Sequence, residues 1–420
     1  MKRKISKEIV AHLPQKQHTL LIGQIGSGKT YLLKQLGESL SKNNFQIYYL
    51  DFDNLTINIL VNETPEKIFR FVPHPDEIEK KPFYLLLDNL QQLKSPSTLL
   101  NFLYDKFKSR IKVIAAGSSE FYLNTVGEDA LPGKKKIIRI NGFDFDEFLK
   151  AKNRIDLLRE IQVFGLDHNA IPSRREEIQK LMEEYLIYGS LPEIVFAKKE
   201  TTKIKLLEQY KQEIIRKEGF KNNVEHLDKF ALLITELSYN IGKHLNKNLV
   251  QKKTTLGSNT LERYVSFFMN NNHLFLVPPF HQLKPKEIIK MSNIYFTDLG
   301  IRNVFTQNFQ PFAIRTDKQQ LLSNFLFLQL VGQHDIKDIF YWQTTDNLPV
   351  DFIVKEKRNK IIGLVVKERN IDFNPTKYKR FINYYPKIPL SLLTIEKNNW
   401  IISSFIESFM ESLSDEVFAL

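Results

Sequence analysis

The chain has 420 residues, a formal net charge of +12 and 42% hydrophobic residues, so it is long and apolar enough for two or three folded domains. It contains no cysteine, which excludes disulfides, thiolate zinc sites, iron–sulfur clusters and cysteine nucleophiles. No apolar run approaches the roughly 18 residues of a membrane span, and the basic N-terminus lacks the apolar core of a signal peptide. We therefore expect a cytoplasmic protein with no membrane partner.

The first part of the chain alternates apolar runs with helical patterns. Thr19–Gly23, Gln46–Asp51, Phe83–Asp88 and Lys112–Gly117 are apolar almost throughout, which is typical of parallel strands buried on both faces. Residues 1–145 are therefore predicted to form a doubly wound α/β domain. A helix should follow the first run, because four leucines recur there at helical spacing: Leu32, Leu33, Leu36 and Leu40.

The remainder of the chain divides into three segments with different secondary-structure patterns. Residues 146–225 have helical patterns and are interpreted as a helical lid or linker region. Residues 226–285 indicate three helices followed by a strand. From 286 to 420 the strand signal returns and a final helix is expected at Phe405–Leu413, which indicates an α+β domain. Most of the positive charge lies in the second half of the chain, so a polyanionic partner is expected there, the alternative being a lysine-rich solvated surface.

The first apolar run leads into a phosphate-binding motif. Residues 23–30 read GQIGSGKT and match the Walker A pattern G-x-x-x-x-G-K-[ST], with a predicted strand before it and a helix after it. Glycines let the backbone wrap closely around phosphates, the lysine neutralises the β- and γ-phosphates, and the threonine hydroxyl ligates Mg²⁺. The expected ATP ligands are Gly23, Gly26, Ser27, Gly28, Lys29 and Thr30, with Thr30 also a metal ligand.

A second acidic element should complete this site. Asp88 ends an apolar strand and is predicted to hold Mg²⁺ through water, as a Walker B acid does. Many ATPases of this class have Glu at the next position, where this chain has Asn89, and an amide orients water but cannot accept its proton. We therefore expect ATP binding with slow or absent hydrolysis, unless Asp51 or Asp53 on the neighbouring strand substitutes. Ser118, after the fourth run, is expected to sense the γ-phosphate or simply to form a turn.

The order of several segments resembles a group of prokaryotic AAA-type P-loop ATPases with a C-terminal domain of unknown function. The matching segments are GQIGSGKT, LLLDNLQQL, AAGSSEFYL, LPGKKKIIRINGFDFDEFL, YLIYGSLPEIV, NIYFTDLGIRNVF and FYWQTTDNLPVDFIV. The resemblance implies an AAA-like core, a small helical region, a winged helix and a fold like PD-(D/E)xK nucleases. This chain departs from the group at Asn89, at Lys134 in place of an arginine, and at Val365 in place of an acid two residues before Lys367.

The 226–285 segment is a candidate DNA-binding element. Its three helices, expected at Phe230–Leu245, Asn248–Lys253 and Ser258–Asn270, followed by a strand, form the pattern of a winged helix-turn-helix. Lysines in such a position contact phosphates, and polar residues of the third helix reach bases. The alternative is a winged helix that packs against another domain or protein. The candidate DNA contacts are Lys243, Lys247, Lys252, Lys253, Asn259, Thr260 and Arg263.

The nuclease-like part is predicted to be inactive. A nuclease of that class needs two carboxylates for Mg²⁺ and a lysine. Asp351 and Lys367 are present, but Val365 occupies the second acid's place and Ser323 stands where the resemblance implies a glutamate. Glu368 falls on the opposite face of its strand from Lys367. Asp351 and Lys367 are then expected to form a structural ion pair, which leaves Mg²⁺ at the P-loop as the expected metal.

Three functions remain open on the sequence. The first is a nucleotide-dependent switch in which ATP and Mg²⁺ bias the engagement of DNA or a partner protein by the basic half. The second is an active ATPase motor or remodeller that uses another acid, or a neighbouring copy, in place of Asn89. The third is an ATP-loaded scaffold for protein interactions without a nucleic-acid role. Homo-oligomers are also expected among AAA-like proteins.

Overall fold

The computed structural model describes residues 3–77, 82–118, 124–125, 128–129, 131–164, 173–219, 226–280, 291–344, 349–356, 360–368 and 374–394. The helix expected at 405–413 lies outside them. The chain divides into two compact units. Unit 1 comprises residues 1–142 and 267–273, and unit 2 comprises 143–266 and 274–420. Within the described residues, no helix combines the length and apolar character that crossing a membrane requires.

Unit 1 contains a five-stranded parallel sheet in the order β2-β3-β4-β1-β7. Four of its strands are the predicted apolar runs, which confirms the α/β fold class. The fifth, β7, was not predicted, because it lies at the sheet edge and its sequence KKIIR is only partly buried. Edge strands lack the continuous apolar run of central ones. The strands are β1 (His18–Ile22), β2 (Ile47–Asp51), β3 (Phe83–Asp88), β4 (Ile111–Gly117) and β7 (Lys135–Arg139).

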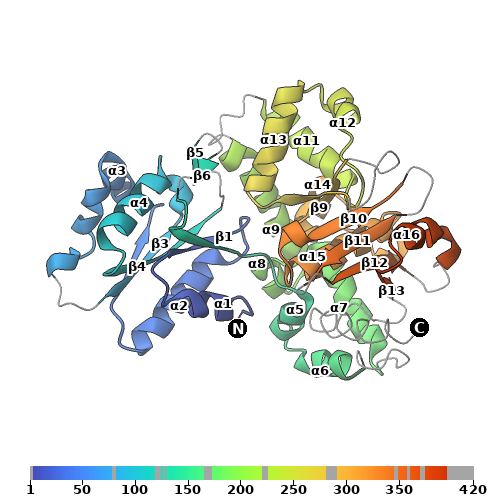
Figure 1. Cartoon of the computed structure of the whole chain (residues 1–420), viewed down its shortest axis with the longest axis horizontal. Helices are drawn as coiled ribbons and strands as arrows, with labels where there is room; N and C mark the ends of the chain where they lie inside the picture. The colour runs from blue at the N-terminus through green and yellow to red at the C-terminus, as the bar shows by residue number, and fades with distance from the viewer. Residues whose placement is uncertain are drawn as a thin grey trace. The chain divides into compact units, whose positions relative to one another are not determined.

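Helices cover both faces of this sheet (Figure 1). Alternate strand residues point to opposite faces, so the sheet has two separate apolar cores. One core contains Ile9 of α1 and the four predicted leucines of α2, whereas the other contains residues of α3, α4 and the short helix η1. The helical segments are α1 (Ser6–His12), α2 (Lys29–Lys42), α3 (Leu55–Glu63), η1 (Pro65–Arg70), η2 (Pro75–Glu77), η3 (Leu90–Gln92) and α4 (Pro96–Phe107). A short antiparallel pair joins β5 (Asn124–Thr125) and β6 (Glu128–Asp129).

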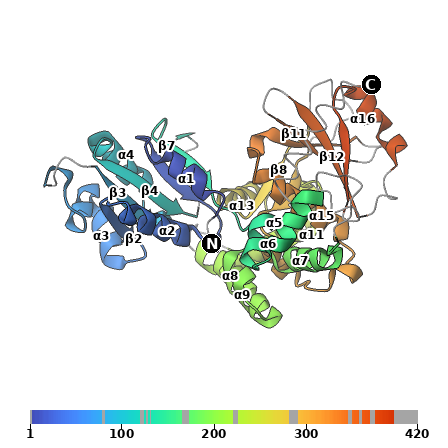
Figure 2. The same ribbon diagram turned by 90° about the horizontal axis from the view of Figure 1, so that it is seen from below.

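Unit 2 begins with helices. α5, α6 and α7 pack together (Figure 2), and a π-helical segment, η5, continues α9. Three more helices then lead into an antiparallel pair of strands, β8 and β9. The helices are α5 (Phe145–Ala151), α6 (Ile155–Phe164), α7 (Arg175–Tyr188), α8 (Pro192–Phe196), α9 (Glu200–Gln212), η5 (Glu213–Glu218), α11 (Leu227–Tyr239), α12 (Lys247–Thr254) and α13 (Ser258–Asn270), of which residues 267–270 are assigned to unit 1. The strands are β8 (Leu274–Val277) and β9 (Asn293–Phe296), so this pair crosses the expected boundary at residue 285.

The last part of unit 2 is a four-stranded mixed sheet in the order β10-β11-β12-β13. Only β12 and β13 pair in parallel. The strands are β10 (Ile339–Trp342), β11 (Val350–Lys355), β12 (Ile361–Lys367) and β13 (Leu390–Thr394). The helical segments are α14 (Leu299–Thr306), η6 (Phe312–Ile314), α15 (Lys318–Val331), η7 (Ile336–Asp338), η10 (Pro375–Tyr378) and α16 (Lys379–Tyr384).

Candidate functional site

The predicted phosphate-binding loop connects β1 to α2 in unit 1. Gly26 and Gly28 have φ angles of 78° and 91°, in the left-handed region that side chains disfavour. A Cβ atom on Gly23 would overlap the carbonyl oxygen of Ile140, so the loop entry packs tightly against the chain that follows β7. The backbone amides at the start of α2 are thus left free of bulky side chains, which is the geometry that accommodates phosphate.

Lys29 points back onto its own loop. Its Nζ donates hydrogen bonds to the carbonyl oxygens of Gly23 and Gln24, both at 2.8 Å. Thr30 is exposed in the first turn of α2. Both residues therefore lie where the sequence predicted an anion and its metal to bind, with the ammonium group held at the loop.

Buried polar atoms of the loop indicate whether its residues suit the phosphates of ATP. Within the part of the chain that the structure describes, Ser27 Oγ is fully buried and forms no hydrogen bond, and both amide atoms of the Gln24 side chain are buried without a partner. Burying such groups unpaired costs about 1–3 kcal/mol each. A phosphate oxygen would satisfy the Ser27 hydroxyl, so the donors present here fit the phosphate chain of ATP.

Arg3 also supports the loop, although no sequence pattern predicted this role. Its guanidinium donates to the carbonyl oxygen of Ser27 (Nη1, 3.3 Å) and to those of Asn141 and Gly142 (Nη2, 3.0 and 2.9 Å). Arg3 is only 7% exposed. It therefore connects the phosphate-binding loop to the chain that leaves β7.

Asp88, the predicted Walker B acid, is buried at the end of β3. Its Oδ2 accepts a hydrogen bond from the Tyr49 hydroxyl, and its Oδ1 accepts one from the backbone N–H of Asn89, both at 2.9 Å. Burial and the charge of Asp88 raise the pKa of Tyr49, so this hydroxyl remains a donor. Asp88 is thus a fixed carboxylate at the carboxyl edge of the sheet, where a hydrated Mg²⁺ would be held.

Asn89 lies among carboxylates. Its Nδ2 donates to Asp51 Oδ1 at 2.9 Å and to Asp53 Oδ2 at 3.0 Å, and its Oδ1 accepts from Gln91 Nε2 at 3.1 Å. The two acids named from the sequence as possible substitutes are therefore in direct contact with Asn89. Parallel pairing of β2 and β3, with Asp51 beside Asp88, causes this arrangement.

Ser118 joins the same network through its backbone. Its N–H donates to Gln91 Oε1 at 3.2 Å, so Gln91 links Ser118 to Asn89. The sequence analysis missed both Tyr49 and Gln91. Tyr49 was detectable from its place two residues before Asp51 on the same strand face, whereas Gln91 had no comparable signal.

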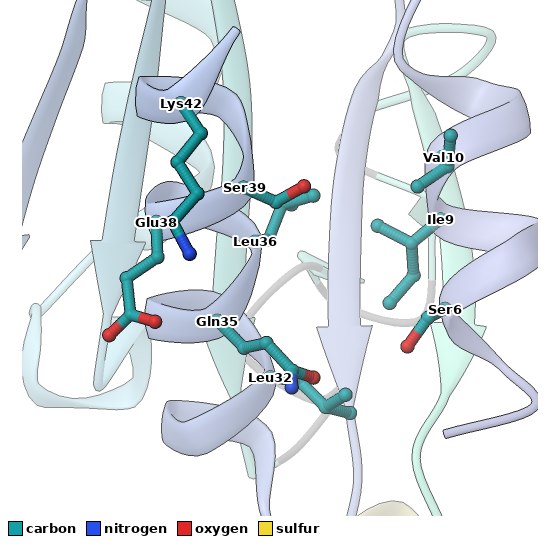
Figure 3. Close-up of a pocket in the computed structure, with 9 residues that line it drawn as sticks. All are labelled: Ser6, Ile9, Val10, Leu32, Gln35, Leu36, Glu38, Ser39 and Lys42. Carbon is teal, nitrogen blue, oxygen red and sulfur yellow. The ribbon is translucent and has the colours of Figure 1, made fainter. Parts of the chain in front are cut away.

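A separate pocket of about 330 Å³ lies between α1 and α2. Side chains from both helices line it, and none belongs to the phosphate-binding loop (Figure 3). The lining residues are Ser6, Ile9, Val10, Leu32, Gln35, Leu36, Glu38, Ser39 and Lys42.

The candidate DNA contacts of unit 2 are not equally available. Lys247 pairs with Glu262 at 2.7 Å, and Lys253 pairs with Glu236 at 2.6 Å. Lys243 and Lys252 are exposed and have no ion pair among the described residues. Exposed ion pairs contribute only about 0–1 kcal/mol, so the two paired lysines remain able to exchange their partners for phosphate.

On α13, two of the three proposed base-contacting residues, Asn259 and Arg263, are exposed, and Thr260 is half-buried. The Arg263 guanidinium lies 5.4 Å from the centre of the Tyr264 ring.

The C-terminal sheet places Asp351 against β12 and α15. Its Oδ2 accepts from the N–H of Val366 at 2.9 Å, and its Oδ1 accepts from the Ser323 hydroxyl at 3.5 Å. Val365 is fully buried in an apolar cluster with Trp342. Among the described residues, Asp351 and Lys367 form no ion pair, contrary to the expectation from the sequence, and no group of acids and histidines has the arrangement of a metal site.

The titration of Asp351 should affect stability. Burial raises the pKa of Asp351 to about 6, above its ordinary 3.8. The folded state therefore binds this proton more tightly than the unfolded chain, and the resulting stabilisation is complete below about pH 4 and lost as the pH rises through 6. We expect Asp351→Asn to gain stability relative to the natural protein between pH 4.5 and pH 7.5, as measured by urea unfolding.

An exposed acid of the same unit provides the control for this experiment. Asp228→Asn should leave the pH dependence of unfolding unchanged, because its carboxylate is exposed at the start of α11. Parallel stability curves for the natural protein and Asp351→Asn would contradict the burial argument.

Comparison with known proteins supports the assignment of unit 1. Residues 15–149 match the family of AAA domains, and residues 179–311 match a domain of unknown function (DUF8612). An uncharacterized protein of Methanocaldococcus jannaschii is 25% identical over 428 residues, which cover 98% of this chain and 88% of that protein. Residues 15–149 are accordingly similar to AAA domains.

The similarity of this chain to solved structures is low. DnaA from Aquifex aeolicus bound to AMPPCP is 17% identical with a TM-score of 0.32, and the match covers 64% of this chain and 85% of DnaA. The ORC1 protein of Aeropyrum pernix in complex with DNA is 12% identical with a TM-score of 0.31, covering 73% of this chain and 93% of ORC1.

Proposed function

We propose that this protein is an ATP-dependent switch with slow or absent ATP hydrolysis that engages DNA through unit 2. The observation that carries the nucleotide part is the P-loop itself, in which Lys29 is held by loop carbonyls and Ser27 Oγ is buried with no partner among the described residues. Both groups gain a phosphate oxygen when ATP binds. Thr30 and Asp88 are the residues that would hold Mg²⁺, which supplies positive charge at the β- and γ-phosphates.

The chain's own residues define the binding step. Lys29 must exchange the carbonyl oxygens of Gly23 and Gln24 for phosphate oxygens, and this exchange changes the contacts of the loop. Arg3 bonds to the same loop at Ser27 and to the chain at Gly142, so loop rearrangement is transmitted to the end of β7. A switch requires such a difference between nucleotide-free and nucleotide-bound states.

The DNA part of the proposal concerns residues 226–285 and their exposed lysines. Three helices followed by a strand pair are the pattern of a winged helix, with α13 as the recognition helix. Lys243 and Lys252 supply exposed positive charge there. We propose that residues 286–420 serve as a nuclease-like but inactive platform, since the buried Val365 cannot bind a metal.

This proposal predicts salt-dependent DNA binding that responds to ATP. The double variant Lys243→Ala with Lys252→Ala should bind DNA with a weaker salt dependence. The plot of log affinity against log salt should become less steep by about 2, because each phosphate contact contributes about 0.9 to its steepness. Affinity should fall for all duplex sequences alike, since phosphate contacts carry no base information. Fluorescence anisotropy of labelled duplex DNA across a salt series, with and without ATP and Mg²⁺, measures both effects.

A charge-matched control distinguishes a local site from general attraction. Lys198 and Lys205 are exposed in unit 2 outside the candidate element, so replacing both with alanine removes the same charge. An equal loss in the control would contradict the proposed site. If no DNA binding occurs at low salt while ATP still binds, the scaffold without a nucleic-acid role is the better function.

A further inference from the structure

Asn89 is fully engaged with protein groups. Both hydrogens of its amide nitrogen are directed to carboxylates, those of Asp51 and Asp53, and its amide oxygen accepts from Gln91. The backbone of Asn89 adopts a φ of 55°, in the left-handed region that asparagine tolerates better than most residues. Asn89 therefore has no free hydrogen to offer a water molecule, and its role here is to hold two carboxylates.

The charges of this cluster explain why an amide suits position 89. Asp51 and Asp53 already bring two negative charges to the side chain, and an amide supplies a donor to each. A glutamate at the same position would supply no donor and would add a third negative charge. The acid missing at position 89, directly after β3, is thus replaced by the carboxylates of Asp51 and Asp53 at the end of β2 and just beyond it.

The two aspartates differ in their free acceptor atoms. Asp53 uses both oxygens, because Oδ1 accepts from Gln92 and Oδ2 accepts from Asn89. Asp51 accepts from the Asp53 N–H and from Asn89 Nδ2 at the same atom, Oδ1. Its Oδ2 has no partner among the described residues, so Asp51 keeps one whole oxygen available to accept a hydrogen bond from water.

Strand geometry places Asp51 on the nucleotide side of the sheet. Asp51 is the register partner of Asp88, and Tyr49, two residues earlier on the same strand face, belongs to the core formed with α2. Tyr49 also donates to Asp88. Since α2 begins at Lys29 and packs against both strands, Asp51 lies at the carboxyl edge on the face that carries the P-loop helix.

We propose that Asp51 is the catalytic carboxylate for ATP hydrolysis and that Asn89 positions it. This inference rests on the proposed function, because it requires ATP at the P-loop. The water oxygen bonds to the γ-phosphorus, and one water proton passes to Oδ2 of Asp51. The bond from that phosphorus to the bridging oxygen breaks, and this oxygen keeps the electron pair and leaves on ADP.

The first test replaces the proposed catalytic acid with an amide in the whole chain. Asp51→Asn should lower kcat for ATP about 100-fold or more, the usual contribution of a general base, with the Kd for a non-hydrolysable ATP analogue changed less than about threefold. The matched variant Asp76→Asn, at an exposed acid of η2 outside this cluster, should keep kcat within about fivefold of the natural protein. Phosphate release and calorimetric titration provide the two readouts.

Thermal unfolding without nucleotide gives a readout independent of activity. Asn89→Glu alone should lower the unfolding midpoint and kcat, because it places a third carboxylate beside two others. Asp51→Asn combined with Asn89→Glu restores one amide beside the carboxylates and should recover the midpoint, but not kcat, because the catalytic carboxylate is absent. Recovery of the midpoint without kcat distinguishes the charge balance of the cluster from the catalytic role of Asp51.

Two results would overturn the assignment of Asp51 while leaving the proposed function intact. One is nucleotide binding by the natural protein with no hydrolysis above that of Lys29→Ala. The other is an Asp51→Asn variant that keeps more than a tenth of kcat. Failure of the natural protein to bind the analogue would instead refute the proposed function itself.

Discussion

Replacing Lys29 with alanine is expected to weaken ATP binding by about 10- to 150-fold, corresponding to the 1.5–3 kcal/mol of a hydrogen bond to a charged group. The ammonium already lies at the loop, 2.8 Å from the carbonyl oxygens of Gly23 and Gln24, so little side-chain ordering remains to be done on binding. Its loss leaves the phosphates without their nearest positive charge. Isothermal titration with ATP and Mg²⁺ measures the change in Kd.

A lysine at the other end of the same helix serves as the control. Lys42 is exposed at the end of α2, so Lys42→Ala removes the same charge from the same helix away from the loop. We expect its Kd for ATP to stay within about twofold of the natural value, because the charge is screened in solvent. An unchanged Kd for Lys29→Ala would contradict the nucleotide site itself.

The sequence predicted the fold around the candidate nucleotide site well because the signals there are local. Buried parallel strands read as continuous apolar runs, and the loop motif has fixed spacing, so the positions of Lys29 and Asp88 followed directly. The nearness of Asp51 to Asn89 followed from topology, since parallel strands end at a common edge. The edge strand β7 was missed because half of it faces solvent.

Other parts of the site depend on tertiary contacts that leave no local pattern. The bond from Tyr49 to Asp88 joins residues 39 positions apart, and Arg3 reaches Gly142 across 139 positions. Lys247 and Lys253 looked free of acids in the sequence, but folding brings Glu262 and Glu236 beside them. A basic segment therefore predicts where charge lies along the chain, but not how much of it remains unpaired.

Two motifs of unit 2 that lie far apart in sequence are also joined by tertiary contacts. The segments YGSLP and TDLG meet at Asp298, a fully buried carboxylate that accepts from the N–H and hydroxyl of Ser190 at 2.7 and 2.9 Å and from the N–H of Ile301 at 2.9 Å. Burial raises the pKa of Asp298, while these hydrogen bonds oppose the rise. The contact between the two motifs leaves no room for a side chain at position 189.

Replacing Gly189 with alanine is accordingly expected to destabilise unit 2 by more than about 4 kcal/mol, a large share of the 5–15 kcal/mol typical of a domain. Gly189 has φ 81° and ψ −162°, a region restricted to glycine that costs other residues about 1–3 kcal/mol. A Cβ atom there would also lie 2.6 Å from the backbone nitrogen of Gly300 and would overlap the Asp298 carboxylate. Strain and overlap act together, so the side chain cannot be accommodated without breaking the Asp298 contacts.

Tryptophan fluorescence during urea unfolding measures this effect selectively, because both tryptophans of the chain, Trp342 and Trp400, belong to unit 2. The control is Gly257→Ala, since a Cβ on Gly257 would meet nothing within 4 Å and its φ is not in the left-handed region. That variant should be neutral or gain up to about 1 kcal/mol, because alanine reduces the entropy of the unfolded chain. If the two variants unfold at the same urea concentration, the close packing of Gly189 against Asp298 does not constrain the fold.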